Sequence, residues 1–183
     1  MILRILRRFI FGFLLILSAA ICWADNNFNF LSEGKYFTVY TKGAISKERI
    51  VQKINSTPIL FEDSSTSDLL SKSLDSLFLE VSDILDIHIY SFHGTIKILP
   101  NTQEIATLAK ANFGNNYQGE SFYIPSNNTI YISATDLTLG MIGHEIAHAI
   151  ISSYFVVPPP AKVQEVLCGY VEYTLRKKTN SLP

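Results

Sequence analysis

Residues 144 to 148 read His-Glu-Ile-Ala-His, and two histidines at this spacing can hold one metal ion when the segment is helical. At about 100° per residue, His144 and His148 lie about 40° apart on the helix surface, one turn apart. Glu145 lies too far round to be a ligand but near enough to reach a metal-bound water. Zinc lowers the pKa of such a water, and a nearby carboxylate can take its proton. The pattern predicts one Zn²⁺ ion, with Glu145 as general base.

The helix that carries these histidines is expected to be buried, because apolar residues surround it on almost every side. They are Leu139, Met141, Ile142, Ile146, Ala147, Ala149, Ile150, Ile151, Tyr154 and Phe155. Burying a carboxylate and two imidazoles without partners would cost on the order of several kcal/mol. A metal or a dense hydrogen-bond network would offset that cost. The alternative is that both histidines are ordinary packing or surface residues.

A third ligand is expected from a second helix at about 161–177. Three prolines at 158–160 end the helix that carries the histidines, and the second helix begins after them. Its best candidate is Glu165. One side of this helix collects Glu165 with Cys168, Gly169 and Glu172, and small residues there would allow close approach to the first helix. The opposite side collects Val163, Val166, Leu167, Tyr170, Val171 and Thr174. The residues alone leave two interpretations open, a ligand at Glu165 or a solvated polar stripe.

The two segments HEIAHAI and EVLCGY, the latter starting at Glu165, resemble the gluzincin metallopeptidases. The likeness is to the small peptidase MA-like domains, whose second motif typically reads EGLAEY. The resemblance implies that His144, His148 and Glu165 bind zinc, that Glu145 is the general base and that the substrate is a peptide or protein. It extends over about residues 36–175, although only the two motifs are specific.

Two departures from the family pattern concern the groups around the ligands. Gluzincins commonly carry an acidic residue four positions after the ligand glutamate, and this chain has Gly169 there. Losing such a carboxylate costs about 10 to 100-fold in metal affinity or activity, so a replacement is expected. Glu172 is the nearest candidate. The C-terminal subdomain that supplies a transition-state donor in larger gluzincins is also expected to be missing. Tyr154 and Tyr173 receive no catalytic role, and Tyr170 is expected in the core.

The amino-terminal segment predicts export. Arg4, Arg7 and Arg8 precede an apolar run at 9–21, and the small residues Cys22 and Ala24 then suit signal peptidase. We expect a signal peptide at 1–24 and a periplasmic or secreted protein. An uncleaved membrane anchor is the alternative, and it would be the only contact with a membrane.

Residues 25–183 are expected to form a single domain. They contain 12 basic and 16 acidic residues, for a net charge of −4, which does not suggest nucleic acid as a partner. They contain one cysteine, Cys168, so an internal disulfide is impossible. Cys168 is interpreted as a packing residue, although as a fourth ligand it would close the zinc site and make the metal structural.

The expected fold class is α+β, with a small, mostly antiparallel sheet packed on helices. Strands are expected at 36–41 and 95–99, and a hairpin at 121–124 and 129–133. Helices are expected at 46–55, at 68–86 and between Asn101 and Gly114, with a polar loop at 61–67. Asp136 is expected to cap the histidine helix, and His88 and His93 to be surface or packing residues. By resemblance, one hairpin strand would pair with an extended peptide.

Three hypotheses follow from these patterns. The first is an exported zinc peptidase of gluzincin type. The second is a non-catalytic zinc-binding domain of peptidase ancestry that binds peptide or envelope polymer. The third is a membrane-tethered structural protein without metal.

Overall fold

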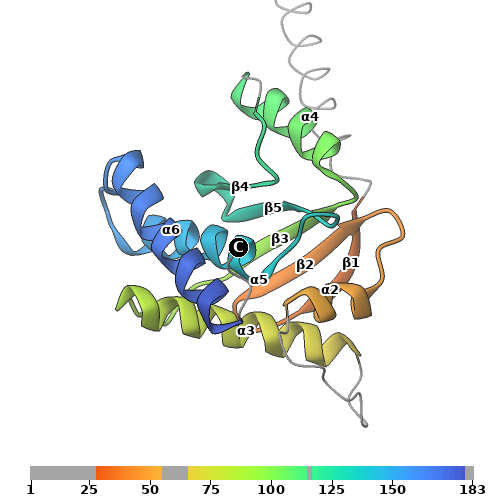
Figure 1. The fold of residues 1–183 in the computed structure, drawn as a ribbon, viewed down its shortest axis with the longest axis horizontal. Helices are drawn as coiled ribbons and strands as arrows, with labels where there is room; N and C mark the ends of the chain where they lie inside the picture. Colours follow the sequence, from red (N-terminus) through yellow and green to blue (C-terminus); the bar gives the residue numbers. More distant parts are fainter. Residues whose placement is uncertain (1–27, 55–65, 115–116, 180–183) are drawn as a thin grey trace, which may run out of the picture.

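The computed structural model describes residues 28–54, 66–114 and 117–179 (Figure 1). The expected signal segment 1–24 lies outside the described residues. So does the expected loop 61–67, except for its last two residues, which begin helix α3 (Thr66–Leu85). Within the described ranges, no helix is both long and apolar enough to cross a membrane.

One mixed five-stranded sheet forms the centre of the fold, and the α+β class is confirmed. Its order is β1 (Phe28–Glu33), β2 (Phe37–Lys42), β3 (Gly94–Leu99), β5 (Thr129–Ser133) and β4 (Ser121–Ile124). The two outer pairs are antiparallel, whereas β2, β3 and β5 run parallel to one another. Strand β4 is therefore an edge strand, and the parallel strands occupy the middle of the sheet.

Helices cover both faces of this sheet (Figure 1). On one face, α2 (Lys47–Ile54), α3, α5 (Leu139–Tyr154) and α6 (Ala161–Lys178) share the main core with the apolar side chains of β2, β3 and β5. On the other face, α4 (Thr102–Phe113) packs in a smaller cluster with Phe122 and Tyr131. Every residue of β5 is buried, as expected for a strand covered on both faces.

Local sequence signals placed several elements correctly. The Asn101 side chain accepts a hydrogen bond from the Glu104 N–H at the start of α4, and Gly114 ends that helix with φ of 69°. The hairpin of β4 and β5 turns through a short 3₁₀ helix (Pro125–Asn127), after which Asn128 adopts the left-handed conformation. These groups act within a few residues of themselves, which is why the sequence alone predicts them.

One local prediction needs correction, and one strand was missed. Thr138, not Asp136, caps α5, since its hydroxyl accepts the Met141 N–H; the Asp136 carboxylate instead accepts hydrogen bonds from Thr102, Ser133 and Thr135. Strand β1 was not expected, because its pairing with β2 shifts register between Phe30 and Ser32, and this irregularity disrupts the alternation of apolar residues.

Helix α6 packs tightly on α5, although not through the residues expected. A Cβ on Gly143 of α5 would lie 2.1 Å from Leu175 Cδ1, so any larger residue would force the buried Leu175 side chain to move. A Cβ on Gly169 of α6 would meet nothing within 4 Å, so the expected close approach at Gly169 is wrong. Cys168 does face α5 and is fully buried, whereas Tyr170 is exposed and not part of the core. The two helices thus approach each other most closely at Gly143 of α5, and not at Gly169 of α6.

The same substitution at the two glycines tests this packing. Gly143→Val should lower the free energy of unfolding by about 2 to 3 kcal/mol, because the added methyl groups overlap a buried leucine. Gly169→Val is the matched control and should change it by less than about 0.5 kcal/mol, because its site is open. Urea unfolding followed by circular dichroism measures both, and equal effects would contradict the proposed interface.

Candidate metal centre

Helix α5 carries the two histidines on its boundary between core and solvent. Ile142, Ile146, Ala149 and Ile150 point into the core, and the helix is buried along most of its length, as expected. His144 and His148 are half-buried, with ring centroids 5.0 Å apart. The two rings therefore lie side by side, one turn apart, at the surface of a cleft.

Glu165 of α6 joins the two rings. One carboxylate oxygen lies 3.5 Å from His144 Nε2 and the other lies 3.3 Å from His148 Nε2. In a tetrahedral zinc site with bonds of about 2.1 Å, neighbouring ligand atoms are about 3.4 Å apart. A charge-assisted hydrogen bond would be shorter, at about 2.7 to 2.9 Å. The spacing of these three side chains thus fits ligands arranged around a small ion better than it fits direct pairing.

Each histidine also has a partner for orienting its ring. Glu172 Oε2 lies 3.2 Å from His144 Nδ1, and Arg176 holds the other Glu172 oxygen at 2.6 Å. Gln164 hydrogen-bonds the His148 side chain and donates to the Pro159 carbonyl. Such second partners fix the ring and its tautomer in metal sites. Glu172, seven positions after Glu165, is thus the carboxylate that contacts His144, whereas position 169 has no side chain to do so.

Cys168 is the other group near the histidines. Its sulfur and one nitrogen of each ring all lie within 4.8 Å of one another, so His144, His148 and Cys168 form a second possible ligand set. The thiol is fully buried, and burial raises its pKa, with Glu165 and Glu145 raising it further. A thiol must ionise to bind zinc. Glu165, an exposed carboxylate with its two oxygens 3.5 and 3.3 Å from the two rings, is the better third ligand.

Glu145 is buried beside the two histidines. Its Oε1 accepts a hydrogen bond of 2.7 Å from Ser121 Oγ on edge strand β4, which leaves Oε2 to accept a proton. Burial raises the pKa of Glu145 to about 7, and the neighbouring Glu165 and Glu172 carboxylates add to the increase, whereas the Ser121 bond opposes it. A carboxyl with a pKa near neutrality is suited to exchange a proton at physiological pH.

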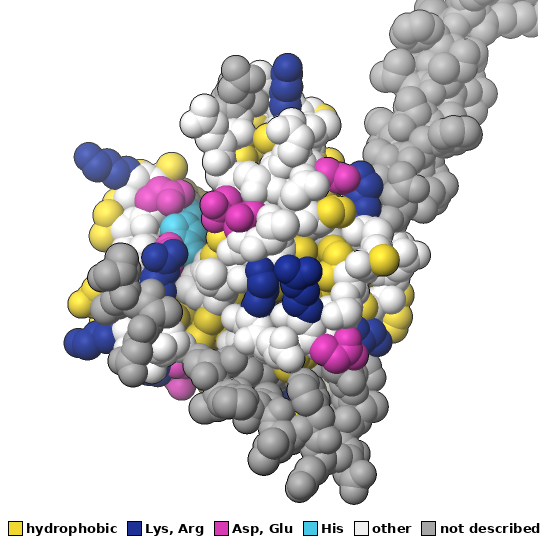
Figure 2. Space-filling view, turned by 45° about the vertical axis from the view of Figure 1, so that its right-hand side comes forward, with side chains coloured by type: hydrophobic (Ala, Val, Ile, Leu, Met, Phe, Trp, Pro, Cys, Tyr) yellow, Lys and Arg dark blue, Asp and Glu magenta, His cyan; other side chains and the backbone are white. Residues whose placement is uncertain are grey.

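The electrostatics of the site favour a bound cation. Three carboxylates, from Glu145, Glu165 and Glu172, surround the two rings. Burial lowers the pKa of His148, and nearby His144 lowers it further, which favours the neutral form that binds metals. On the α6 side of the molecule, Figure 2 shows a histidine surface between acidic side chains. Arg176 pairs with Glu172, and a divalent ion would relieve repulsion among the carboxylates.

An open cleft gives access to these groups. Its larger part has a volume of about 520 Å³ and includes His144, Glu145, His148 and Glu165, with aromatic walls formed by Phe113, Tyr117, Phe122 and Tyr123. A smaller part of about 310 Å³ continues past Glu145 toward Glu172 and Arg176. Tyr117 lines both parts, and burial raises its pKa to about 12, so the hydroxyl stays protonated.

The structure brings together the four residues expected at the site, His144, Glu145, His148 and Glu165. His88 and His93 are both exposed, as expected, and His93 hydrogen-bonds Thr38 and the Lys35 carbonyl instead.

Sequence reasoning missed three contributors to the site, Ser121, Tyr117 and Gln164. No motif identified Ser121 or Tyr117, because the sheet and not the helix motif brings them to Glu145. Gln164 directly precedes Glu165, and this neighbouring position was the only feature of the sequence that could have pointed to Gln164.

Comparisons of the chain with protein-family models, with curated proteins and with solved structures found no match. The geometry described above therefore carries the functional argument.

The raised pKa of Glu145 predicts a pH-dependent stability cost in the metal-free protein. A folded-state pKa above the unfolded value favours the protonated form, so stability falls as pH rises from about 4.5 to about 7. Glu145→Gln should remove this cost. It should therefore stabilise the metal-free protein, prepared with a chelator, by about 1 to 3 kcal/mol at pH 8 but not at pH 4. Glu120→Gln, an exposed neighbour, is the control, and urea unfolding is the measurement. Parallel pH profiles for wild type and Glu145→Gln would contradict the assignment.

Proposed function

We propose that the chain is a zinc-dependent peptidase, in which His144, His148 and Glu165 hold Zn²⁺ and Glu145 is the general base. The observation that carries this proposal is that Glu165 contacts both imidazoles, with one oxygen 3.5 Å from His144 and the other 3.3 Å from His148. That spacing matches the edge of a zinc tetrahedron. The resemblance of the two motifs to gluzincins adds support.

Each residue has a separate task in this proposal. Zinc, when bound, polarises the substrate carbonyl and makes a water acidic near neutral pH. Glu145 takes the proton of the attacking water on Oε2, because Ser121 already engages Oε1. It later returns the proton to the leaving amine. Glu172 and Gln164 orient His144 and His148, and the half-open cleft admits the substrate.

The edge strand beside the cleft supports an extended peptide as the substrate. Ser133 N–H bonds the Glu120 carbonyl, so alternation turns the N–H and C=O groups of Ser121 and Tyr123 toward the free edge of β4. The Tyr117 hydroxyl donates to the Ser121 carbonyl at this edge. A peptide added as a further strand would replace that hydroxyl and lie across Glu145. The N-terminal segment 1–24 leads us to propose that this substrate is met outside the cytoplasm.

A second candidate is a non-catalytic zinc-binding domain that binds peptide or envelope polymer. The observation that favours it is the buried Cys168 sulfur within 4.8 Å of both histidines. If that sulfur were a ligand together with Glu165, the ion would have four protein ligands and no open position for water. The two candidates differ in which side chain the metal requires and in whether the protein turns over peptides.

Zinc titration of single variants distinguishes the ligand sets. Glu165→Gln should weaken zinc binding by more than about 100-fold, since it removes a ligand, and Glu172→Gln by about 10 to 100-fold, since it removes only an orienting group. Cys168→Ala is the control and should change affinity by less than about 3-fold. Chelator competition measures all three. If Cys168→Ala loses zinc and Glu165→Gln keeps it, the open site is wrong.

Peptide hydrolysis tests the role of Glu145. Glu145→Gln should retain one zinc per chain and lose about 10² to 10⁴-fold in turnover, because the base is removed and the ligands stay. His144→Ala should lose both zinc and turnover. Turnover of a broad peptide library is followed by mass spectrometry, with chelation abolishing it and zinc restoring it. An equal zinc content in wild type and His144→Ala would refute the site, and no turnover by zinc-loaded wild type would favour the non-catalytic candidate.

A further inference from the structure

A second pocket lies at the carboxyl ends of the three parallel strands. Strands β2, β3 and β5 are followed by residues 44–46, by Pro100 and by Ala134 and Thr135, and all of these line one cavity of about 300 Å³. It shares no lining residue with the histidine cleft. In open sheets with parallel strands, small ligands bind at this edge, because the loops diverge there. The position therefore gives a first reason to expect a ligand.

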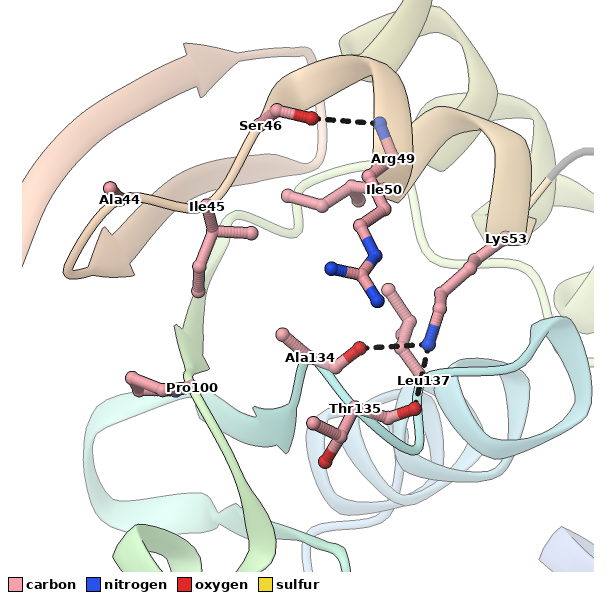
Figure 3. Close-up of a pocket in the computed structure, with 10 residues that line it drawn as sticks. All are labelled: Ala44, Ile45, Ser46, Arg49, Ile50, Lys53, Pro100, Ala134, Thr135 and Leu137. Carbon is pink, nitrogen blue, oxygen red and sulfur yellow. Dashed lines mark hydrogen bonds between the residues drawn. The ribbon is translucent and has the colours of Figure 1, made fainter.

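Arg49 of α2 places a positive charge in this pocket. Figure 3 shows its guanidinium extending from α2 into the space between Ile45 and Ala134. Among the described residues, no carboxylate pairs with it. Its neighbour Lys53 is already engaged, since Nζ donates to the Ala134 carbonyl at 2.9 Å and to the Thr135 carbonyl at 2.7 Å. An arginine fork without an acidic partner is suited to bind an anion with two oxygens.

Beside Arg49, the pocket holds two further donors. Ser46 Oγ accepts the Arg49 backbone N–H at 3.3 Å, so its own O–H is available to donate. Lys53 has a third N–H beyond its two carbonyl bonds. The two carbonyls accept from Lys53, and the Thr135 hydroxyl gives its proton to Asp136, so none of these three groups donates to a ligand. The donors that remain, the Ser46 hydroxyl and the third Lys53 N–H, favour a negative ligand.

The remaining walls are apolar. They are formed by Ala44, Ile45, Ile50, Pro100, Ala134 and Leu137. A volume of about 300 Å³ is at the lower end of ligand pockets, so it admits a body of a few carbon atoms. An inorganic anion alone would leave this apolar surface in contact with water, whereas a neutral apolar ligand would leave the guanidinium without a partner.

We propose that this pocket binds a small aliphatic carboxylate, with the carboxylate on the Arg49 guanidinium and the hydrocarbon against Ile45, Ile50 and Leu137. This ligand site is separate from the histidine centre. Its test therefore does not depend on whether the peptidase proposal is correct.

Calorimetric titration of the full-length chain with 4-methylpentanoate tests the site. The protein is first freed of metal with phenanthroline and dialysed, so that no carboxylate can bind zinc at the histidines. We expect saturable binding with one site per chain. Acetate, which lacks the hydrocarbon, and 4-methylpentanamide, which lacks the charge, should each bind about 10-fold more weakly or worse. Equal affinity for the amide, or for inorganic phosphate, would overturn the proposal.

Variants locate the binding at Arg49. Arg49→Gln should weaken 4-methylpentanoate binding by about 10 to 100-fold, the effect of losing a charge-assisted hydrogen bond. Lys47→Gln removes a charge from the same helix outside the pocket and should change binding by less than about 2-fold. Arg49 is exposed, so the variant is expected to fold, and circular dichroism verifies this. Unchanged affinity in folded Arg49→Gln, or no binding by wild type at millimolar ligand, would refute the site.

Discussion

The close packing of α6 against α5 is the constraint on which the candidate site depends. Gly143 leaves room for Leu175, and Cys168, Val171 and Leu175 fill the interface. Because these contacts fix the rotation of α6, Glu165 meets both imidazoles and Glu172 meets His144. A larger residue at Gly143 would push the helices apart, and Glu165 would then move away from the two imidazoles that it contacts at 3.5 and 3.3 Å. Packing of apolar side chains thus sets the geometry of the polar ones.

The polar groups at this interface carry a free-energy cost for folding. Glu145 is almost completely buried, with one hydrogen bond from Ser121, and its neighbours Glu165 and Glu172 carry the same charge. Such an arrangement is costly in the absence of a cation, because like charges repel and burial disfavours ionisation. Active sites commonly hold groups of this kind at the expense of stability, since a strained or desolvated group is more reactive. The cost itself is therefore an argument for a functional role.

The sheet connects the two candidate sites. Its edge strand β4 supplies Ser121 to Glu145, and its central strand β5 leads through residues 134–138 into α5. The start of this connection also lines the pocket around Arg49, where Lys53 holds its carbonyls. The parallel centre of the sheet thus opens one pocket at its carboxyl edge, while the antiparallel edge strand borders the other. One sheet borders both pockets because its parallel and antiparallel pairings leave different edges accessible.

The sequence by itself determined the residues that act through their own helix or turn. The spacing of His144 and His148, the cap at Asn101 and the apolar run of β5 are periodic or local, and the structure agrees with each. Only the tertiary structure decided which residues of α6 face α5, since the expected contact at Gly169 and the expected burial of Tyr170 were both wrong. It alone brought Ser121 to Glu145 across 24 positions and placed Arg49 opposite Ala134. Such contacts depend on how elements pack, and packing is a property of the whole core, which no single stretch of sequence contains.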